Sequence, residues 1–156
     1  MLAVTAPIEA GIGMAARDFD QAIERYHLAA HAFLNGDPEP YKAGFSDRDD
    51  VTLANPFGPV RRGSKEVRET MERAAANYRD GEVIGFENVS THVTADLGYI
   101  VEVERFRARV GGAKDMAHVT LRTTSILRRE EGDWKIAHRH ADPITGARPA
   151  ASVIAT

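Results

Sequence analysis

Hydrophobic residues recur every three or four positions along the first part of the chain, on one face of a helix. The spacing predicts an amphipathic helix from Asp18 to about Phe33. Asp18, followed three residues later by Gln21, matches a capping box, and Asn35-Gly36 is a helix stop signal. The predicted buried face consists of Phe19, Ile23, Tyr26, Ala30 and Phe33.

Shorter elements are expected after this helix. Residues 39–45 predict a brief second helix, and residues 51–54 a short strand that ends at Asn55-Pro56. Residues 57–62 read as a turn and a second short strand. A third helix is expected over residues 64–78, with Ser64 as N-cap. Its predicted buried face consists of Val67, Met71, Ala74, Ala75 and Tyr78.

The hydrophobic period then changes to two, which is typical of strands. Four runs follow, over about 82–94, 97–110, 115–129 and 133–142, with turn residues such as Gly111-Gly112 between them. Short connections predict antiparallel hairpins in sequence. Helices followed by a long antiparallel sheet indicate an α+β fold, in which a curved sheet wraps the helices as a cone with a pocket at its mouth.

The length of 156 residues suits one core. We expect an N-terminal arm over 1–17, one domain over 18–143 and a C-terminal tail over 144–156. The tail is rich in Ala and Pro, so it is either disordered or covers a neighbouring subunit.

Composition narrows the function classes. The net charge is −3, from 20 basic and 23 acidic residues, which favours neither nucleic acid nor an anionic membrane as partner. The absence of cysteine excludes disulfides, thiolate catalysis and cysteine zinc sites. Because no Lys or Arg precedes Arg17 and no apolar run approaches about 20 residues, a cytoplasmic protein is expected.

Three strings resemble the SnoaL-like branch of the nuclear transport factor 2-like superfamily, which also includes ketosteroid isomerases. They are Asn35-Gly36-Asp37-Pro38, Asn55-Pro56-Phe57-Gly58 with Arg62-Gly63, and the segment Trp134 to Asp142. The resemblance covers about residues 18–143 and implies a cystatin-like α+β barrel that commonly pairs into homodimers through its sheet. It leaves the activity open, because this fold hosts isomerases, hydrolases, lyases, ligand binders and assembly domains.

The ketosteroid isomerase mechanism does not carry over. In those enzymes an Asp just before the Pro of the second string is the general base, and this chain has Asn55 there. An amide cannot accept a proton in useful amounts near pH 7. The Tyr of their first helix falls on Leu28, although Tyr26 is nearby.

The last strand carries the first candidate chemistry. Alternation places Trp134, Ile136, His138, His140 and Asp142 on one face, which the Trp and Ile predict to be concave. His138 and His140 would then point into the cone. There they would act as general acid and base, or hydrogen-bond within the core or to a ligand.

The two preceding strands offer charged partners. Glu104 is expected beside His140 as its orienting group or lies in an exposed carboxylate row, where Glu102 is expected. Either face of the run 115–129 could line the cone. We favour the polar one, with His118 and Arg122, because Arg122 would then stabilise an anion.

His27 and His31 lie four apart on the first helix, a spacing that can bind a metal. We expect a solvated edge and no metal site, because no carboxylate supports the pair. Tyr26, Phe57 and Trp134 form either an aromatic ligand wall or ordinary core.

These observations predict a pocket for a small apolar molecule that bears a carbonyl or carboxylate, with no cofactor. As an enzyme, it would use His140, His138 and Glu104 as catalytic residues. The predicted ligand contacts are Arg122, Asn55, Tyr26, Phe57, Trp134 and His118. The alternative is a non-catalytic ligand binder or a homodimeric assembly module.

Overall fold

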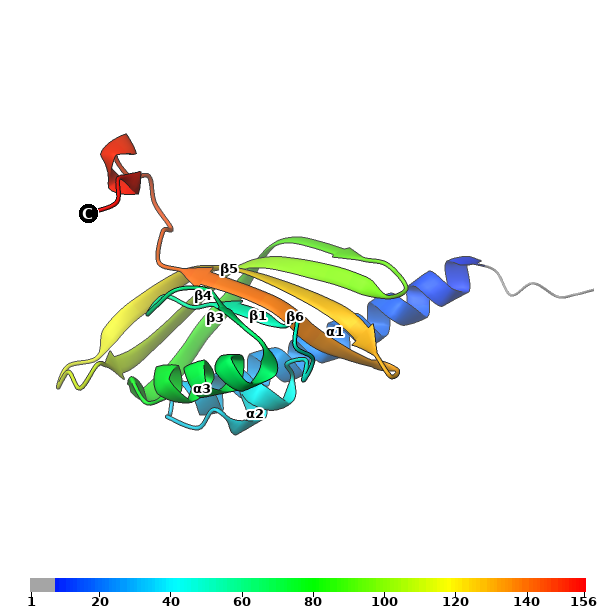
Figure 1. The fold of residues 1–156 in the computed structure, drawn as a ribbon, viewed down its shortest axis with the longest axis horizontal. Helices are drawn as coiled ribbons and strands as arrows, with labels where there is room; N and C mark the ends of the chain where they lie inside the picture. The colour runs from blue at the N-terminus through cyan, green and yellow to red at the C-terminus, as the bar shows by residue number, and fades with distance from the viewer. Residues whose placement is uncertain (1–7) are drawn as a thin grey trace, which may run out of the picture.

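Three helices lie on one side of a strongly curved sheet in the computed structural model, which describes residues 8–156, with side chains from residue 13 (Figure 1). They are α1 (Ile8–Phe33), α2 (Glu39–Ala43) and α3 (Ser64–Ala75). The sheet arches over them, and this arrangement places the hydrophobic core between the helices and the concave face.

The sheet has six strands, in the order β2-β1-β6-β5-β4-β3. The last four strands are sequential antiparallel hairpins, while β1 runs parallel to β6. The α+β prediction, with its meander of long strands, is confirmed. The strands are β1 (Thr52–Ala54), β2 (Arg61–Arg62), β3 (Tyr78–Val93), β4 (Leu97–Val110), β5 (Ala117–Glu130) and β6 (Asp133–Asp142).

Most of the irregularities in strand pairing lie in β3. Its pairing with β4 shifts register at three places, after Arg79, Val83 and Asn88. Each shift is an irregularity of the bulge type, which bends a strand and increases its local twist. Consequently the sheet curls around α1 and leaves space at one end.

The apolar stripe of α1 forms the centre of the core, as its spacing predicts. Phe19 is fully buried, Ile23 and Tyr26 are also buried, and Phe33 packs against the same cluster. Phe19 meets the Trp134 ring edge-on at 5.3 Å between centroids, a favourable aromatic geometry.

The start of α1 and the N-cap and end of α3 differ from the predictions, whereas α1 ends at Phe33 as predicted. α1 begins at Ile8, so Asp18 lies within the helix and is not its N-cap. The described part of the expected arm is therefore helical, whereas residues 1–7 lie outside the described residues. Helix α3 is capped by Gly63 and ends at Ala75, and Tyr78 begins β3.

The C-terminal tail stands off the body of the domain (Figure 1). It contains one turn of 3-10 helix, η1 (Ala150–Val153), and residues 145–156 are all exposed. Among the described helices, none is long and apolar enough to cross a membrane.

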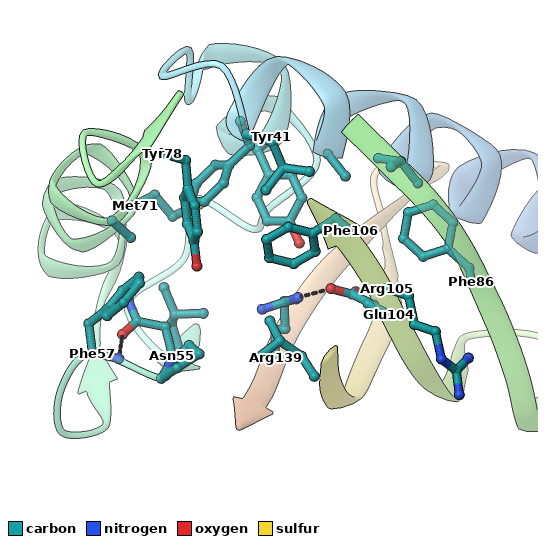
Figure 2. Close-up of a pocket in the computed structure, with 18 residues that line it drawn as sticks. Tyr41, Asn55, Phe57, Met71, Tyr78, Phe86, Glu104, Arg105, Phe106 and Arg139 are labelled. Carbon is teal, nitrogen blue, oxygen red and sulfur yellow. Dashed lines mark hydrogen bonds and ion pairs between the residues drawn. The ribbon is translucent and has the colours of Figure 1, made fainter. Parts of the chain in front are cut away.

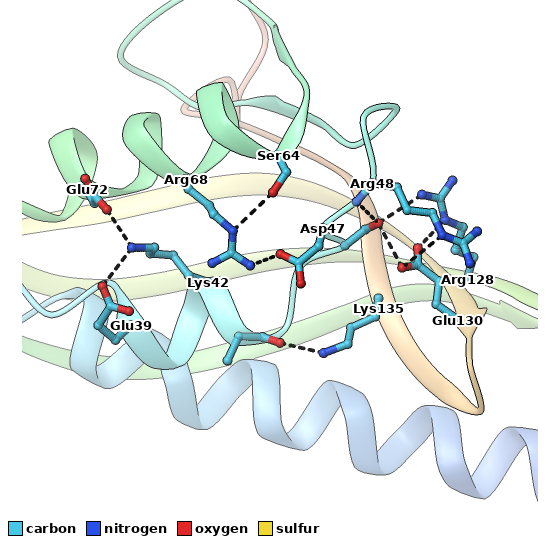
Figure 3. A network of polar contacts seen from close by, with 12 residues as sticks. Glu39, Lys42, Asp47, Arg48, Ser64, Arg68, Glu72, Arg128, Glu130 and Lys135 are labelled. Atoms are coloured by element: carbon cyan, nitrogen blue, oxygen red, sulfur yellow. Dashed lines mark hydrogen bonds and ion pairs between the residues drawn. The ribbon is translucent and has the colours of Figure 1, made fainter.

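Two groups of ion pairs connect α2 and the loop after it to neighbouring elements (Figure 3). Lys42 of α2 donates to Glu39 at 2.8 Å and to Glu72 of α3 at 2.6 Å. Further along, the guanidinium of Arg128 donates to Asp50 at 2.5 and 2.6 Å and to Glu130 at 2.5 Å. These contacts join the loop after α2 to β5.

Arg128→Met is expected to lower the free energy of unfolding by roughly 1–2 kcal/mol, because its guanidinium loses four hydrogen bonds at once, three of them to carboxylates. Arg107→Met is the matched control: it removes a single pair with Glu82, in which both side chains are largely exposed. Urea unfolding measures both. Equal losses in the two variants would show that the Arg128 cluster adds nothing beyond an ordinary surface pair.

Candidate functional site

A cavity of about 60 Å³ opens between the helices and one end of the sheet. Apolar side chains make up most of its wall, and polar groups come from the segment after β1 and from β4 and β6 (Figure 2). The lining includes Phe33, Tyr41, Leu53, Asn55, Phe57, Met71, Tyr78, Val83, Phe86, Glu104, Phe106, Leu121 and Arg139. Such a surface suits a small organic molecule with few polar atoms.

A buried ion pair lies at the wall of this cavity. Arg139 of β6 donates from Nη2 to Oε2 of Glu104 at 2.8 Å, and each side chain is 8% exposed. Tyr26 of α1 donates to the other Glu104 oxygen at 2.6 Å and accepts from Arg139 Nε at 2.7 Å. Three elements are thus joined by one closed set of hydrogen bonds, which satisfies the buried charges.

Burial and this network fix the protonation states. Burial tends to lower the pKa of Arg139, but Glu104 and the two nearby tyrosines outweigh it, so the guanidinium remains charged. Burial raises the pKa of Tyr78 to about 12 and raises the pKa of Tyr41 further. Both phenols are therefore neutral hydrogen-bond donors at physiological pH.

Two donors are available to a ligand. The third guanidinium nitrogen of Arg139, Nη1, faces away from Glu104 toward the side of the cavity where Tyr78 and Asn55 lie (Figure 2). The Tyr78 hydroxyl points into the same space (Figure 2). A fixed cation beside a neutral phenol can bind an oxygen that carries full or partial negative charge.

The prediction that His138 and His140 point into the cone is wrong. His138 is half-buried and its Nδ1 lies 2.7 Å from the Thr52 hydroxyl, whereas His140 is exposed and its Nε2 lies 2.8 Å from Asp142. Neither imidazole lines the cavity. Burial lowers the pKa of His138, and His140 lowers it further.

A bulge in β6 explains this error. Leu127 pairs with Ile136 and the adjacent Ile126 pairs with His138, so Ala137 is an extra residue. The extra residue exchanges the two faces from that point on. Trp134 and Ile136 are buried as predicted, but the buried residues after the bulge are Arg139 and Ala141.

The favoured face of the run 115–129 is also wrong. Leu121, Thr123, Ser125 and Leu127 face inward, and all four are buried. Arg122 lies on the outer face and donates to Asp142 at 2.7 Å, and His118 is exposed. Neither residue reaches the cavity.

Glu102 was expected in solvent but is 2% exposed. Nε2 of His27 lies 2.9 and 3.1 Å from its two oxygens, and the imidazole stacks on Phe86 with 3.7 Å between ring centroids. His27 is thus a partner for a buried carboxylate, while His31 is exposed. Among residues 13–156, whose side chains the structure describes, no group of three acidic, His or Cys side chains is placed to hold a metal.

Of the other predicted ligand contacts, two line the cavity and two do not. Asn55 and Phe57 line it, so their expected part in binding is compatible with the geometry. Tyr26 acts through Glu104 and Arg139. Trp134 belongs to the core.

Arg139, Tyr41 and Tyr78 line the cavity although the sequence does not predict it. Strict alternation places Arg139 outside, and the helical spacing assigns Tyr78 to the third helix. The short segment around Tyr41 has too few residues for a period to be read. The many charged and His residues of β6 leave Arg139 without a distinguishing signal in the sequence.

The comparisons with known proteins agree with this architecture. The SnoaL-like domain family matches residues 20–144, which is most of the chain. No curated protein matches the chain.

Solved structures of the same fold share little sequence with it. A nuclear transport factor 2-like protein from Salmonella enterica has a TM-score of 0.70 at 16% identity, covering 92% of this chain and 99% of that one. A proposed dehydratase of the same family from Streptomyces avermitilis has a TM-score of 0.69 at 19% identity, covering 86% and 99%. A ketosteroid isomerase-like protein from Erwinia carotovora has a TM-score of 0.68 at 18% identity, covering 83% and 96%. The family match shows that this chain belongs to the SnoaL-like domain family, and these structures show that it has the nuclear transport factor 2-like fold.

Proposed function

We propose that the protein binds a small, mainly apolar organic molecule by one carbonyl or carboxylate oxygen. The observation that carries the proposal is the buried Arg139 at the cavity wall, with Tyr78 beside it. In a low-dielectric site, two such donors hold an oxygen far more strongly than they would in water. The apolar remainder of the wall would receive the hydrocarbon part of the molecule.

Binding is better supported than proton transfer. Within the described cavity lining, Glu104 is the one carboxylate, and both of its oxygens already accept hydrogen bonds, from Tyr26 and Arg139. A general base must approach the proton that it removes. Glu104 would have to give up one partner to do so, and we therefore place the pocket among ligand-binding sites.

Pairing of two copies through the outer face of the sheet stays a prediction. It is compatible with the binding proposal, because the cavity opens on the side of the sheet that carries the helices.

Benzoate is a suitable first probe, since it combines one apolar ring with one carboxylate. We expect Tyr78→Phe to weaken benzoate binding about tenfold, because a hydrogen bond to a charged group is worth roughly 1.5–3 kcal/mol. Tyr99→Phe, on the exposed face of β4, is the matched control and should bind like wild type. Titrations followed by nuclear magnetic resonance give both affinities and map the contacts.

Two results would contradict the proposal. One is the absence of saturable benzoate binding to the wild-type protein. The other is equal affinity in wild type and Tyr78→Phe, with the shifted resonances lying outside the cavity.

A further inference from the structure

A second cavity, of about 130 Å³, lies next to the first between α1, α2 and the sheet. Its wall includes Tyr26, Ala29, Tyr41, Leu127, Trp134 and Ile136. These side chains are aromatic or aliphatic, and the one charged residue in the described lining is Arg25, which is exposed, whereas Glu104 and Arg139 line the first cavity. The second space is therefore suited to a hydrocarbon group without charge.

Tyr41 lines both cavities, so its side chain forms part of the wall between them. The ring is buried and lies 5.1 Å from the ring of Tyr26 and 5.0 Å from that of Phe33, centroid to centroid. The Arg139 guanidinium lies 5.7 Å from its centroid. The phenol is thus held on several sides at once.

The backbone that carries Tyr41 is also fixed. Lys42 ties α2 to Glu72 of α3, and Lys135 of β6 donates to the carbonyl of Ala43 at 2.9 Å (Figure 3). A short helix alone is only marginally stable, so these contacts set its position. A ring on such a support stays in place when a ligand enters.

We propose that Tyr41 sets the size of the molecule that the first cavity accepts. The inference rests on the proposed function and adds a substrate class: compounds with one ring, whose oxygen meets Arg139 and whose ring packs beside Tyr41. Because Tyr41 is the one residue shared by the two described linings, a smaller side chain there would open the first cavity toward the second, which has about 130 Å³. Two-ring carboxylates would then fit.

The test compares benzoate with biphenyl-4-carboxylate in four proteins: wild type, Tyr41→Leu, Tyr41→Phe and Phe45→Leu. Phe45 is the matched control, because it is fully buried and packs 5.7 Å from the Tyr41 ring but lines neither cavity. Wild type, Tyr41→Phe and Phe45→Leu should prefer benzoate. Tyr41→Leu should bind the two-ring acid roughly tenfold more tightly than wild type does.

The position of the second ring provides an independent readout. In Tyr41→Leu it should give nuclear Overhauser contacts to the methyl groups of Leu127 and Ile136. If Tyr41→Leu does not fold, Tyr41→Met opens the wall with a more adaptable side chain. The inference is overturned if wild type binds both acids equally, or if Phe45→Leu gains as much as Tyr41→Leu.

A neutral pair of probes separates this inference from the proposed function. If none of the four proteins binds either acid, the proposed binding of a ligand oxygen by Arg139 is wrong. The role of Tyr41 is then tested with phenol and 4-phenylphenol, which carry no carboxylate. If Tyr41→Leu alone gains affinity for 4-phenylphenol, the result supports the size limit set by Tyr41 independently of any carboxylate. Failure of both pairs in every protein overturns it.

Discussion

Replacing Arg139 by Met is expected to lower the free energy of unfolding by about 3–5 kcal/mol, since removal of one partner leaves a buried charge uncompensated. The carboxylate left without its charged partner is Glu104, whose side chain is 8% exposed. Tyr26 would also lose the hydrogen bond that it accepts from Arg139 Nε. Urea unfolding followed by circular dichroism at pH 7 measures the loss.

Two further variants decide whether the unpaired Glu104 carboxylate causes the loss of stability in Arg139→Met. Arg139→Met combined with Glu104→Leu removes both charges, and apolar pairs of similar volume often replace buried ion pairs without loss. We therefore expect the double variant to recover most of the stability. Arg122→Met, which breaks the pair with Asp142 on the outer face, should cost far less stability than Arg139→Met, because the Arg122 side chain is largely exposed. A double variant no more stable than Arg139→Met would locate the effect in packing and not in charge.

The same variants bear on binding. Arg139→Met with Glu104→Leu keeps the cavity but removes its buried cation, and the other lining arginine, Arg105, is paired with Glu87, so benzoate should no longer bind. Retention of wild-type affinity in a folded double variant would show that the carboxylate does not meet Arg139.

The fold follows from features that act over short distances. The period of the α1 stripe, from Phe19 to Phe33, and the alternation along the four long strands each depend on one element at a time. Hence the α+β architecture and its sequential hairpins are predictable from the chain. The exact start of α1 is not, because Asp18 has the chemistry of an N-cap but lies inside a longer helix.

The site depends on features that alternation does not contain. One extra residue at Ala137 exchanges the faces of β6, which moves His138 and His140 outside and brings Arg139 inside. Charged residues are also predicted wrongly, because a carboxylate is expected in solvent. Glu102 and Glu104 are buried, since His27 of α1 contacts the first and Arg139 of β6 contacts the second. The partners are 75 and 35 residues apart in the sequence, so only the folded chain brings them together.

Gly81 illustrates a third limit, close contact between two elements. It lies near the start of β3, just before the strand that alternation predicts from residue 82. In the structure its backbone exchanges hydrogen bonds with the side chain of Asn35, which accepts from Gly81 N at 3.2 Å and donates to Gly81 O at 3.1 Å. This contact holds the end of α1 against β3.

Gly81→Ala is expected to lower the free energy of unfolding by about 3–4 kcal/mol. An added Cβ would lie 2.3 Å from Cβ and 2.5 Å from the carbonyl oxygen of the buried Leu34, so backbone must move. Overpacking costs roughly 1–3 kcal/mol, and displacement of β3 also weakens the two hydrogen bonds of Asn35. Because Tyr78 and Val83 flank this point and line the cavity, benzoate affinity should fall as well.

Gly85→Ala is the matched control on the same strand. A Cβ there meets no atom within 4 Å, and a side chain in a strand interior is normally neutral or stabilising. We expect Gly85→Ala to unfold at the wild-type urea concentration or slightly above it. Equal stability of the two variants would mean that the end of α1 yields to the methyl group. The close packing of Leu34 on Gly81 would then not be what positions Tyr78 at the cavity.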